Sequence, residues 1–264
     1  MKKIVSLIVT LLTIATLANT YTTTAYAATT PEVKLNDNGT ITVDYDYNYT
    51  NRVKVLVSKD SKTYQYELTT GNNDVELPLS EGNGTYTVTI AKNTEGTKYA
   101  VVKKFTINAT NTNSVFTTAN QIVNYDAEDA AIELAAELTK DATNEAEKVE
   151  AIYEYVVNNY SYDYNKINTI AANTTYVPSI EETFTAKTGI CYDISTLVAA
   201  MLRSVNVECK VVKGYTPAAS TYHAWNQVKV NGQWQTMDVT YDVQIENNNM
   251  FKAASLYSDV RYAY

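Results

Sequence analysis

The sequence predicts an α+β protein with two domains, and three observations lead to this class. Residues 28–110 contain about seven short segments of alternating polar and apolar residues, separated by turn residues. Residues 126–160 and 191–202 instead carry apolar residues at helical spacing. An Asn231-Gly232 pair between alternating residues then indicates a β-hairpin. Strands first, and helices with a hairpin afterwards, are typical of an all-β domain followed by a mixed one.

Residues 1–27 have the features of a secretory signal peptide. Lys2 and Lys3 precede an apolar run from Ile4 to Ala18, and the sequence Ala25-Tyr26-Ala27 is a typical cleavage site. The apolar run is short for a membrane span, and no other stretch is long enough. We therefore expect a secreted, extracellular protein, free or held at the cell surface, whose mature chain begins at Ala28.

The mature chain is acidic. Removal of the signal peptide takes away Lys2 and Lys3 but no acidic residue, so the formal net charge changes from −8 to −10. This charge argues against nucleic acid or an anionic membrane as a partner. The remaining length suits two domains. We expect a signal peptide over 1–27, a β-sandwich over 28–110, a polar linker over 111–124 and a second domain over 125–264.

The first domain is predicted to be an immunoglobulin-like sandwich, because about seven short strands with regular turn signals are typical of that fold. The strand candidates are Glu32–Leu35, Thr40–Tyr47, Arg52–Ser58, Thr63–Leu68, Asp74–Leu77, Thr85–Ala91 and Tyr99–Ile107. The segment has no histidine, cysteine or tryptophan, so it offers little catalytic chemistry. It is either a spacer or a module that binds a surface polymer or a protein substrate through its tyrosines.

Three helices are predicted in the second domain. The first runs over Asp126 to Lys140, and the second over Thr143 to Tyr160 with Thr143 as its cap. The third starts near Cys191 and carries a buried stripe. The residues of that stripe are Ile194, Leu197, Val198, Met201 and Leu202. The segment from Ser161 to Pro178 is irregular and polar, and we expect it to border the functional cleft.

The chain has one histidine and two cysteines, and one cysteine lies in the first turn of the third helix. The positive end of a helix and its free amides stabilise a thiolate at Cys191, and the same amides can hold an oxyanion. Cys209 lies between Val207 and Val211 in a predicted strand, which indicates a packed core thiol. The alternative is a disulfide between the two cysteines.

The hairpin predicts which acidic residues approach the histidine. A two-residue turn at Asn231-Gly232 pairs Val230 with Gln233 and, further out, His223 with Thr240. Asp238 and Asp242 then share the face of His223, each one diagonal step away, roughly 7 Å at the backbone. We prefer Asp238, which lies deeper in the sheet. The alternative is that the histidine is an ordinary strand residue and both carboxylates are solvated.

Cysteine, histidine and aspartate together form an activated thiol nucleophile. No second histidine and no pair of cysteines offers metal-ligand spacing, so we expect neither a metal nor a cofactor. The motifs carrying these residues are Lys187 to Ser195, His223-Ala224-Trp225, Gly232-Gln233-Trp234 and Asp238-Val239-Thr240.

These motifs resemble the transglutaminase-like domains of the papain-like cysteine enzymes, and the resemblance covers roughly residues 126 to 245. It implies that Cys191 is the nucleophile, His223 the base and Asp238 the group that orients the base. It also implies a nucleophile helix packed on an antiparallel sheet. One departure is Val239, because relatives often have proline after the aspartate.

The activity implied is acyl transfer from an amide of a protein or peptide, including cell-wall peptide, through a cysteine thioester. Water as the acceptor gives a peptidase or amidase, and an amine gives cross-linking. Trp225 and Trp234 on the face of His223 could shield the thioester, which favours an amine. The polar segment from Ser161 to Pro178 excludes water poorly, and on balance we expect hydrolysis. The alternative is a non-catalytic surface binding module with a relic triad.

Overall fold

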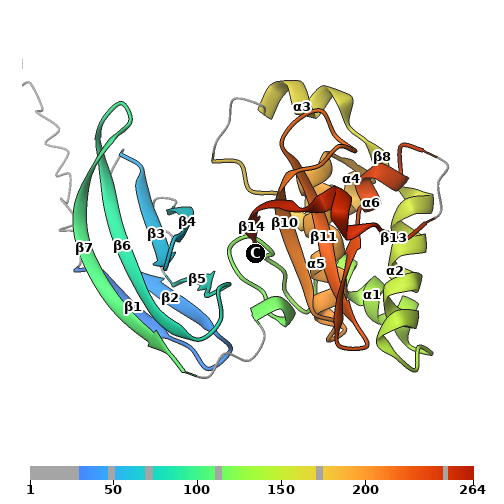
Figure 1. The fold of residues 1–264 in the computed structure, drawn as a ribbon, viewed down its shortest axis with the longest axis horizontal. Coiled ribbons are helices and arrows are strands. Elements are labelled where there is room, and N and C mark those ends of the chain that lie inside the picture. The colour runs from blue at the N-terminus through green and yellow to red at the C-terminus, as the bar shows by residue number, and fades with distance from the viewer. Residues whose placement is uncertain (1–29, 47–50, 69–73, 111–114, 171–174, 246–248) are drawn as a thin grey trace, which may run out of the picture.

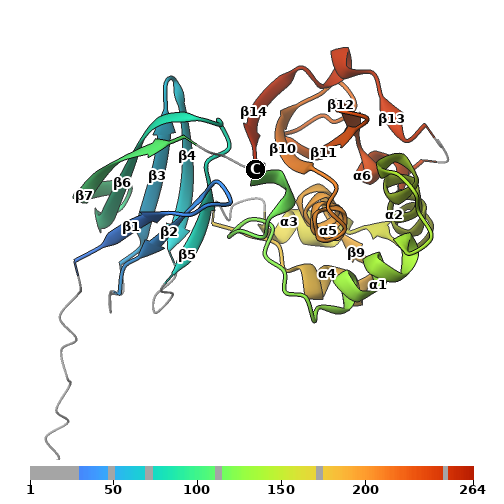
Figure 2. The ribbon, with the colours of Figure 1, turned by 90° about the horizontal axis from the view of Figure 1, so that it is seen from below.

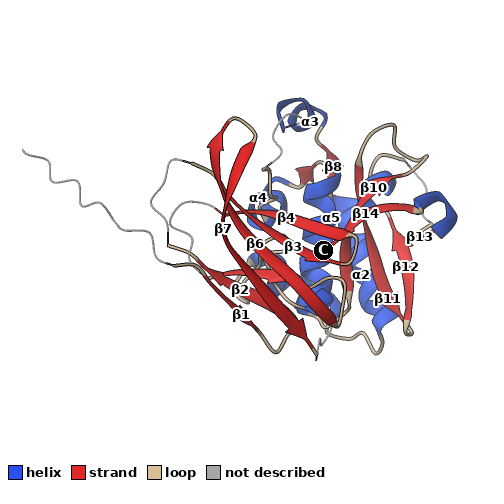
Figure 3. Ribbon diagram, turned by 60° about the vertical axis from the view of Figure 1, so that its left-hand side comes forward, coloured by secondary structure: helices blue, strands red, loops and turns tan. Residues whose placement is uncertain are grey.

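The computed structural model describes residues 30–46, 51–68, 74–110, 115–170, 175–245 and 249–264. The predicted signal peptide, residues 111–114 of the predicted linker and residues 171–174 of the polar segment lie outside these residues. The described part is a mixed helix-and-strand fold with six α-helices and several antiparallel sheets (Figure 3). No helix within it is both long and apolar enough to cross a lipid bilayer.

The N-terminal part forms two antiparallel sheets that lie beside one another (Figures 1 and 2). One has the strand order β1-β2-β5, and the other β4-β3-β6-β7. The strands are β1 (Glu32–Leu35), β2 (Thr40–Asp44), β3 (Val53–Lys59), β4 (Lys62–Leu68), β5 (Val75–Pro78), β6 (Gly84–Glu95) and β7 (Lys98–Ala109). Each predicted strand segment therefore contains a strand, and β6 and β7 extend beyond their predicted bounds.

The alternation of residues explains how these sheets bury one face. In β3 the side chains of Val53, Val55 and Val57 are buried, while the residues between them are partly exposed. Successive strand residues point to opposite faces, so the three valines share the inner one. They belong to a core that also contains Ile41 and Leu77 from the other sheet.

The C-terminal part contains a five-stranded antiparallel sheet with the order β13-β12-β11-β10-β14. Its strands are β10 (Cys209–Tyr215), β11 (His223–Val230), β12 (Gln233–Met237), β13 (Phe251–Lys252) and β14 (Asp259–Ala263). The remaining elements are η1 (Val115–Thr117), α1 (Ala130–Thr139), α2 (Glu145–Asn159), β8 (Ser161–Tyr162), α3 (Tyr164–Ile170), α4 (Ile180–Ala186), β9 (Thr188–Gly189), α5 (Cys191–Ser204), α6 (Val239–Asp242) and η2 (Ala254–Tyr257).

Helix α5 is the central element of this part. It packs on β10 and β11 and also contacts α1, α2 and α4, so it lies between the sheet and the other helices (Figure 2). All five residues of its predicted apolar stripe are fully buried. Nearly the whole helix is buried, which is expected of a helix covered on all sides.

Two helix starts differ from the prediction. Helix α1 begins at Ala130, four residues after the predicted Asp126. The cap of α2 is Asn144, whose Oδ1 accepts the backbone N–H of Glu147 at 3.1 Å. Thr143, the predicted cap, instead donates its backbone N–H to the Glu147 carboxylate at 2.6 Å. Both residue types cap helices well, so the sequence alone did not distinguish them.

The two parts of the chain contact each other through residues 115–125 and through β14. The backbone N–H of Gln121 donates to Glu76 O at 2.9 Å, and its side chain donates to Glu67 O at 2.6 Å. The ring of Tyr64 packs edge-on against Tyr262 and Tyr264, with centroids 5.5 and 5.4 Å apart. The sheet that carries the histidine is therefore supported from outside by the N-terminal strands.

Candidate active site

Cys191 is the first residue of α5, and a buried aspartate fixes the turn that places it. The backbone N–H of Ile190 donates to Oδ2 of Asp193 at 2.9 Å. Gly189 makes room for this contact, since a Cβ at that position would lie 2.7 Å from Cβ of Asp193. Asp193 is fully buried at the positive end of the helix, where a carboxylate is stabilised.

Two residues from the polar segment bind the carboxylate of Asp193. Lys166 of α3 lies 2.8 Å from Oδ2, and the hydroxyl of Tyr176 donates to Oδ1. Burial alone lowers the pKa of Lys166, but its contacts with Asp193 and Tyr176 outweigh burial and raise it. The sequence prediction did not include these three residues. An aspartate three residues after a helix cap is a capping signal, but nothing local indicates its partners.

The hairpin has the predicted register over most of its length. Val230 pairs with Gln233, and pairing continues to Asn226 with Met237. The predicted pairing of His223 with Thr240 is wrong, because β12 ends at Met237 and the chain turns into α6. Asp238 caps that short helix, and its Oδ1 accepts the backbone N–H of Tyr241 at 3.0 Å.

Asp238 is the carboxylate that contacts the histidine. Nε2 of His223 lies 2.8 Å from Oδ2 of Asp238, which is fully buried. The hydroxyl of Tyr257, on η2, donates to the same oxygen at 2.8 Å. Asp242 makes other contacts, with Tyr153 OH at 2.9 Å and with Nζ of Lys252 at 2.5 Å. Tyr257 was not predicted, since it follows the hairpin in an unpatterned stretch.

Cys191 also lies close enough to His223 to raise the pKa of the imidazole. Because Nε2 is bonded to Asp238, Nδ1 is the nitrogen left for the thiol. Burial alone lowers the pKa of His223, but the bond to Asp238 and the proximity of Asp238 and Cys191 outweigh it and raise the pKa to about 10. The ring is therefore an imidazolium at neutral pH, which places a cation beside Cys191.

Aromatic rings hold the imidazole in place. The ring of Trp225 stacks on His223, with centroids 6.2 Å apart and planes at 23°. Tyr257 meets Trp225 edge-on at 5.3 Å. Trp234 does not complete a wall here, contrary to the hypothesis from the sequence. It packs on Phe116 and Lys210, and its strand partner Lys229 lies six residues along β11 from His223, about 20 Å away.

The second cysteine, Cys209, is a packed residue of the core. Cys209 is fully buried, and burial raises the pKa of its thiol to about 12. The side chain of Asn226 donates to its sulfur at 3.5 Å. Both cysteines are free, so the alternative of a disulfide is wrong for this structure. Among the described ranges, no cluster of three or more histidine, cysteine, aspartate or glutamate side chains could hold a metal ion.

Donors for an oxyanion are available next to Cys191. Ile190 has no polar side chain, so the amides of the first turn of α5 have no side-chain cap. Tyr162 lies on β8, which pairs with β9 through Gly189. Burial, followed by the proximity of Cys191, raises the pKa of Tyr162 to about 12, so its hydroxyl stays protonated and can donate.

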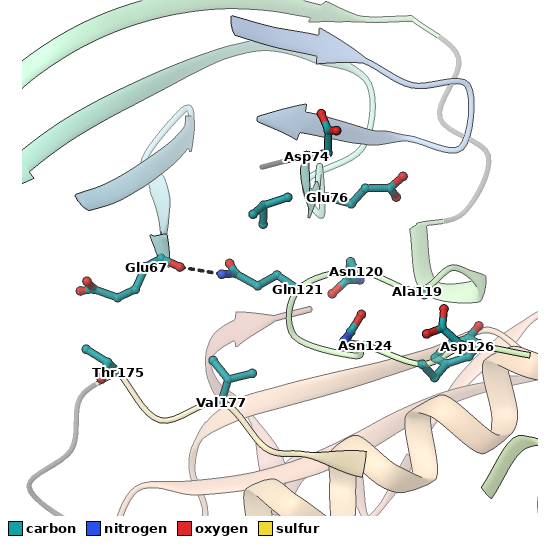
Figure 4. Close-up of a pocket in the computed structure, with 12 residues that line it drawn as sticks. Glu67, Asp74, Glu76, Ala119, Asn120, Gln121, Asn124, Asp126, Thr175 and Val177 are labelled. Atoms are coloured by element: carbon teal, nitrogen blue, oxygen red, sulfur yellow. Dashed lines mark hydrogen bonds between the residues drawn. The ribbon is translucent and has the colours of Figure 1, made fainter. Parts of the chain in front are cut away.

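A large pocket lies away from these residues, between the two parts of the chain. It has a volume of about 670 Å³ and is lined by residues from β4, β5 and residues 119–126 (Figure 4). Four carboxylates line it, those of Glu67, Asp74, Glu76 and Asp126. Neither the thiol nor the imidazole lines this pocket, so it is separate from the candidate active site.

The match to a family model agrees with this geometry. Residues 132–239 match the model of the transglutaminase-like superfamily, a span that contains Cys191, His223 and Asp238. The chain carries a transglutaminase-like superfamily domain. The match ends before η2 and β14, so Tyr257 lies outside it. No curated protein matches the chain.

Several solved structures are similar to the chain. One is that of a proposed cysteine protease from Cytophaga hutchinsonii, with 16% identity, a TM-score of 0.46 and coverage of 80% of this chain and 76% of that one. A TGase structure has 24% identity, a TM-score of 0.38 and coverage of 50% and 35%. Red sea bream transglutaminase has 10% identity, a TM-score of 0.32 and coverage of 76% and 48%. The chain thus spans less than half of the last two.

Proposed function

We propose that this protein is a cysteine-dependent enzyme that acts on amide bonds of proteins or peptides through a thioester on Cys191. The observation that carries the proposal is the position of His223. Its ring is hydrogen-bonded to the buried Asp238 at 2.8 Å, and Cys191, at the start of a helix, lies close enough to raise the pKa of the ring. This is the arrangement that thiol catalysis requires.

The geometry supports the following steps. The thiolate of Cys191 attacks the amide carbonyl, and the first-turn amides of α5, with the hydroxyl of Tyr162, hold the developing oxyanion. The imidazolium of His223 gives its proton to the leaving amine, which departs and leaves a thioester. The neutral imidazole then takes a proton from the incoming water or amine, whose attack releases the acyl group and restores the thiolate. Asp238 keeps the ring oriented throughout.

Hydrolysis is favoured over amine transfer. Shielding of the thioester would need apolar walls beside the nucleophile. Helix α3 in the neighbouring polar segment has no buried residue, and Trp234 lies far along the hairpin. The ring of Trp225 stacks on His223, but Tyr176, 6.2 Å from Tyr192, is only partly buried and brings a polar hydroxyl to the site. Water therefore has better access than a larger amine.

The proposal also covers the N-terminal domain and the place where the protein acts. The strand orders β1-β2-β5 and β4-β3-β6-β7 support an immunoglobulin-like sandwich for residues 28–110. The acidic chain and the leader-like segment over 1–27 support action outside the cell on protein or cell-wall peptide. The sandwich serves as a support for the catalytic sheet or as a substrate-binding module.

A single assay separates the possible activities. Residues 28–264 and the Cys191→Ala variant are incubated with a glutamine-rich protein and a labelled primary amine, and ammonia release, label incorporation and chain cleavage are followed together. We expect ammonia release or cleavage that exceeds incorporation at millimolar amine and disappears in Cys191→Ala. Greater incorporation would identify a cross-linking enzyme instead.

A non-catalytic binding module predicts a different result. Neither product would form, and iodoacetamide at about pH 6 would label Cys191 no faster than a free cysteine, because thiolate character is what speeds the reaction. Labelling confined to Cys191 and slowed in His223→Ala would contradict that alternative.

A further inference from the structure

Lys213 lies on β10 beside the nucleophile and has no carboxylate partner. Its ammonium group sits 3.3 Å from the ring centroid of Tyr192 and 5.4 Å from that of Tyr264. Within the described residues it makes neither an ion pair nor a hydrogen bond. Lys166 and Lys252, near the same site, each pair with a buried aspartate. Among the described residues, Lys213 therefore has no carboxylate counter-ion.

Lys213 lies near both Cys191 and His223, as the contacts of two adjacent residues show. Tyr192, under its ammonium, directly follows Cys191, and Gly214 pairs with His223 across the sheet. Burial lowers the pKa of Lys213 to about 7, and the charge of Cys191 acts in the opposite direction. The ammonium and the sulfur are thus within electrostatic range of one another.

The regular pairing of β10 with β11 places this side chain. The register between β10 and β14 shifts next to it, with Arg261 of β14 as the extra residue, so Lys213 keeps its ordinary strand position. Gly214 permits the close approach of β14, since a Cβ there would lie 2.0 Å from the carbonyl oxygen of Asp259. Lys213 pairs with Ala224 and Tyr262, so its side chain lies on the face of the sheet that α5 covers.

An unpaired, mostly covered ammonium is costly, because its three N–H donors lose water and find no acceptor. The faces of Tyr192 and Tyr264 offset only part of this cost. A partly exposed lysine of this kind can gain an anion that arrives from solution. The described residues supply no carboxylate there, which leaves the ammonium open to an anionic group of the substrate.

We propose that Lys213 is a specificity-determining residue that binds a carboxylate of the acyl donor, close to the carbonyl that Cys191 attacks. The proposal rests on the proposed function, in which Cys191 is the nucleophile. Donors with an acidic side chain or a free terminal carboxylate next to the scissile amide are then preferred over their neutral amides. The carboxylate and the ammonium form a charge-assisted hydrogen bond in a site with little water.

Two alkylating reagents test this directly, because iodoacetate and iodoacetamide differ only by a carboxylate in place of an amide. Their rates at Cys191 are measured by mass spectrometry of the full mature chain at pH 7, and the ratio of the two rates is the readout. Wild type is compared with Lys213→Met, with Lys213→Arg, which keeps the charge, and with Lys210→Met. Lys210 lies on the same strand, also over an aromatic ring, but beside Trp234.

The ratio of the iodoacetate rate to the iodoacetamide rate is expected to fall about tenfold in Lys213→Met, the loss expected of one charge-assisted contact. Lys213→Arg restores most of it, and Lys210→Met leaves it as in wild type. An unchanged ratio in Lys213→Met overturns the proposal. If that variant loses its folded circular-dichroism spectrum, Lys213→Gln replaces it with the same expected result.

The same data separate failure of this proposal from failure of the proposed function. Fast labelling of Cys191 by both reagents, slowed in His223→Ala but with a ratio independent of residue 213, overturns only the role of Lys213. Slow labelling by both reagents, unaffected by His223→Ala, overturns the activated thiol itself.

Peptide substrates then identify the source of the carboxylate. One pair has glutamate or glutamine at the residue that supplies the scissile carbonyl, and another has a terminal carboxylate or carboxamide beyond it. The pair whose acidic member is preferred by wild type, and loses that preference in Lys213→Met, gives the source. Equal turnover of acid and amide in both pairs contradicts the proposal.

Discussion

Nε2 of His223 and the hydroxyl of Tyr257 both bond to Oδ2 of Asp238, each at 2.8 Å. The oxygen that orients the imidazole is therefore itself held from a second side, by a residue that follows the hairpin. Oδ1 of the same carboxylate accepts the backbone N–H of Tyr241 at 3.0 Å. Because Asp238 is fully buried, its position depends on these three donors.

Cys191→Ala is expected to abolish activity with little effect on folding. In the proposed mechanism Cys191 carries the chemistry, so we expect a loss of about a thousandfold or more in kcat/KM. The side chain lies at the edge of the core, and its removal should lower the free energy of unfolding by less than about 1 kcal/mol. Denaturant unfolding and the turnover assay check the two parts, and residual turnover above a hundredth of wild type would contradict the assignment.

Asp238→Ala should leave only residual activity, whereas Asp242→Ala should keep nearly the full activity of the wild type. In the proposed mechanism Asp238 orients the base without reacting, so kcat is expected to fall by about a hundredfold to ten-thousandfold. Asp242 bonds to Tyr153 and Lys252 instead of His223. Both variants should unfold more easily, by about 1–3 kcal/mol, because each leaves buried donors unpaired. Loss of kcat in Asp242→Ala, with Asp238→Ala like wild type, would show that the roles are reversed.

The titration of His223 can be followed directly, because it is the only histidine in the chain. The structure predicts a pKa of about 10 in the wild type, measured by NMR of the ring protons in a protein without a histidine tag. Asp238→Ala and Cys191→Ala should each lower it. Since the folded pKa is raised, His223 stabilises the fold fully below its unfolded pKa of about 6.5. That stabilisation is lost as the pH rises towards 10. Titration near 6.5 in the wild type would contradict the ion pair.

Protonated Lys213 should destabilise the fold, whereas protonated His223 stabilises it. Its pKa is about 7 in the folded chain, so the unfolded chain binds the proton more tightly. The cost of holding an ammonium there is fully present below pH 7 and disappears as the pH rises to about 10.5. Lys213→Met should therefore stabilise the fold by about 1–3 kcal/mol at pH 6 and by little at pH 10. Denaturant unfolding at the two pH values checks this, and a difference that does not depend on pH would refute it.

The N-terminal limit of the catalytic part is predicted to lie before Thr118. The buried Arg203 donates to Thr118 O at 2.9 Å, and Val115 is buried beside it in the chain. A fragment over 115–264 should therefore melt several degrees above one over 119–264, because the shorter one leaves a buried guanidinium N–H unpaired. Thermal unfolding of both fragments checks the difference. If neither fragment folds, the division into two domains is wrong.

Local patterns in the sequence account for much of the fold. Val53, Val55 and Val57 alternate because a strand has period two, and the stripe from Ile194 to Leu202 repeats at helical spacing. Asn231-Gly232 adopts positive φ values of 51° and 77°, which sets the register of the hairpin. These features depend on residues within one element, so they are visible in the sequence.

The tertiary structure alone decided how the site is completed. Because β12 ends at Met237, Asp238 is a helix cap and not a strand residue. The alternation of residues in the sequence does not indicate this end. The contacts of Lys166 with Asp193, Tyr257 with Asp238 and Lys213 with Tyr192 join separate elements. A residue pattern shows which face of an element is buried, but the identity of the partner on that face depends on how the elements pack, and packing is a property of the whole fold.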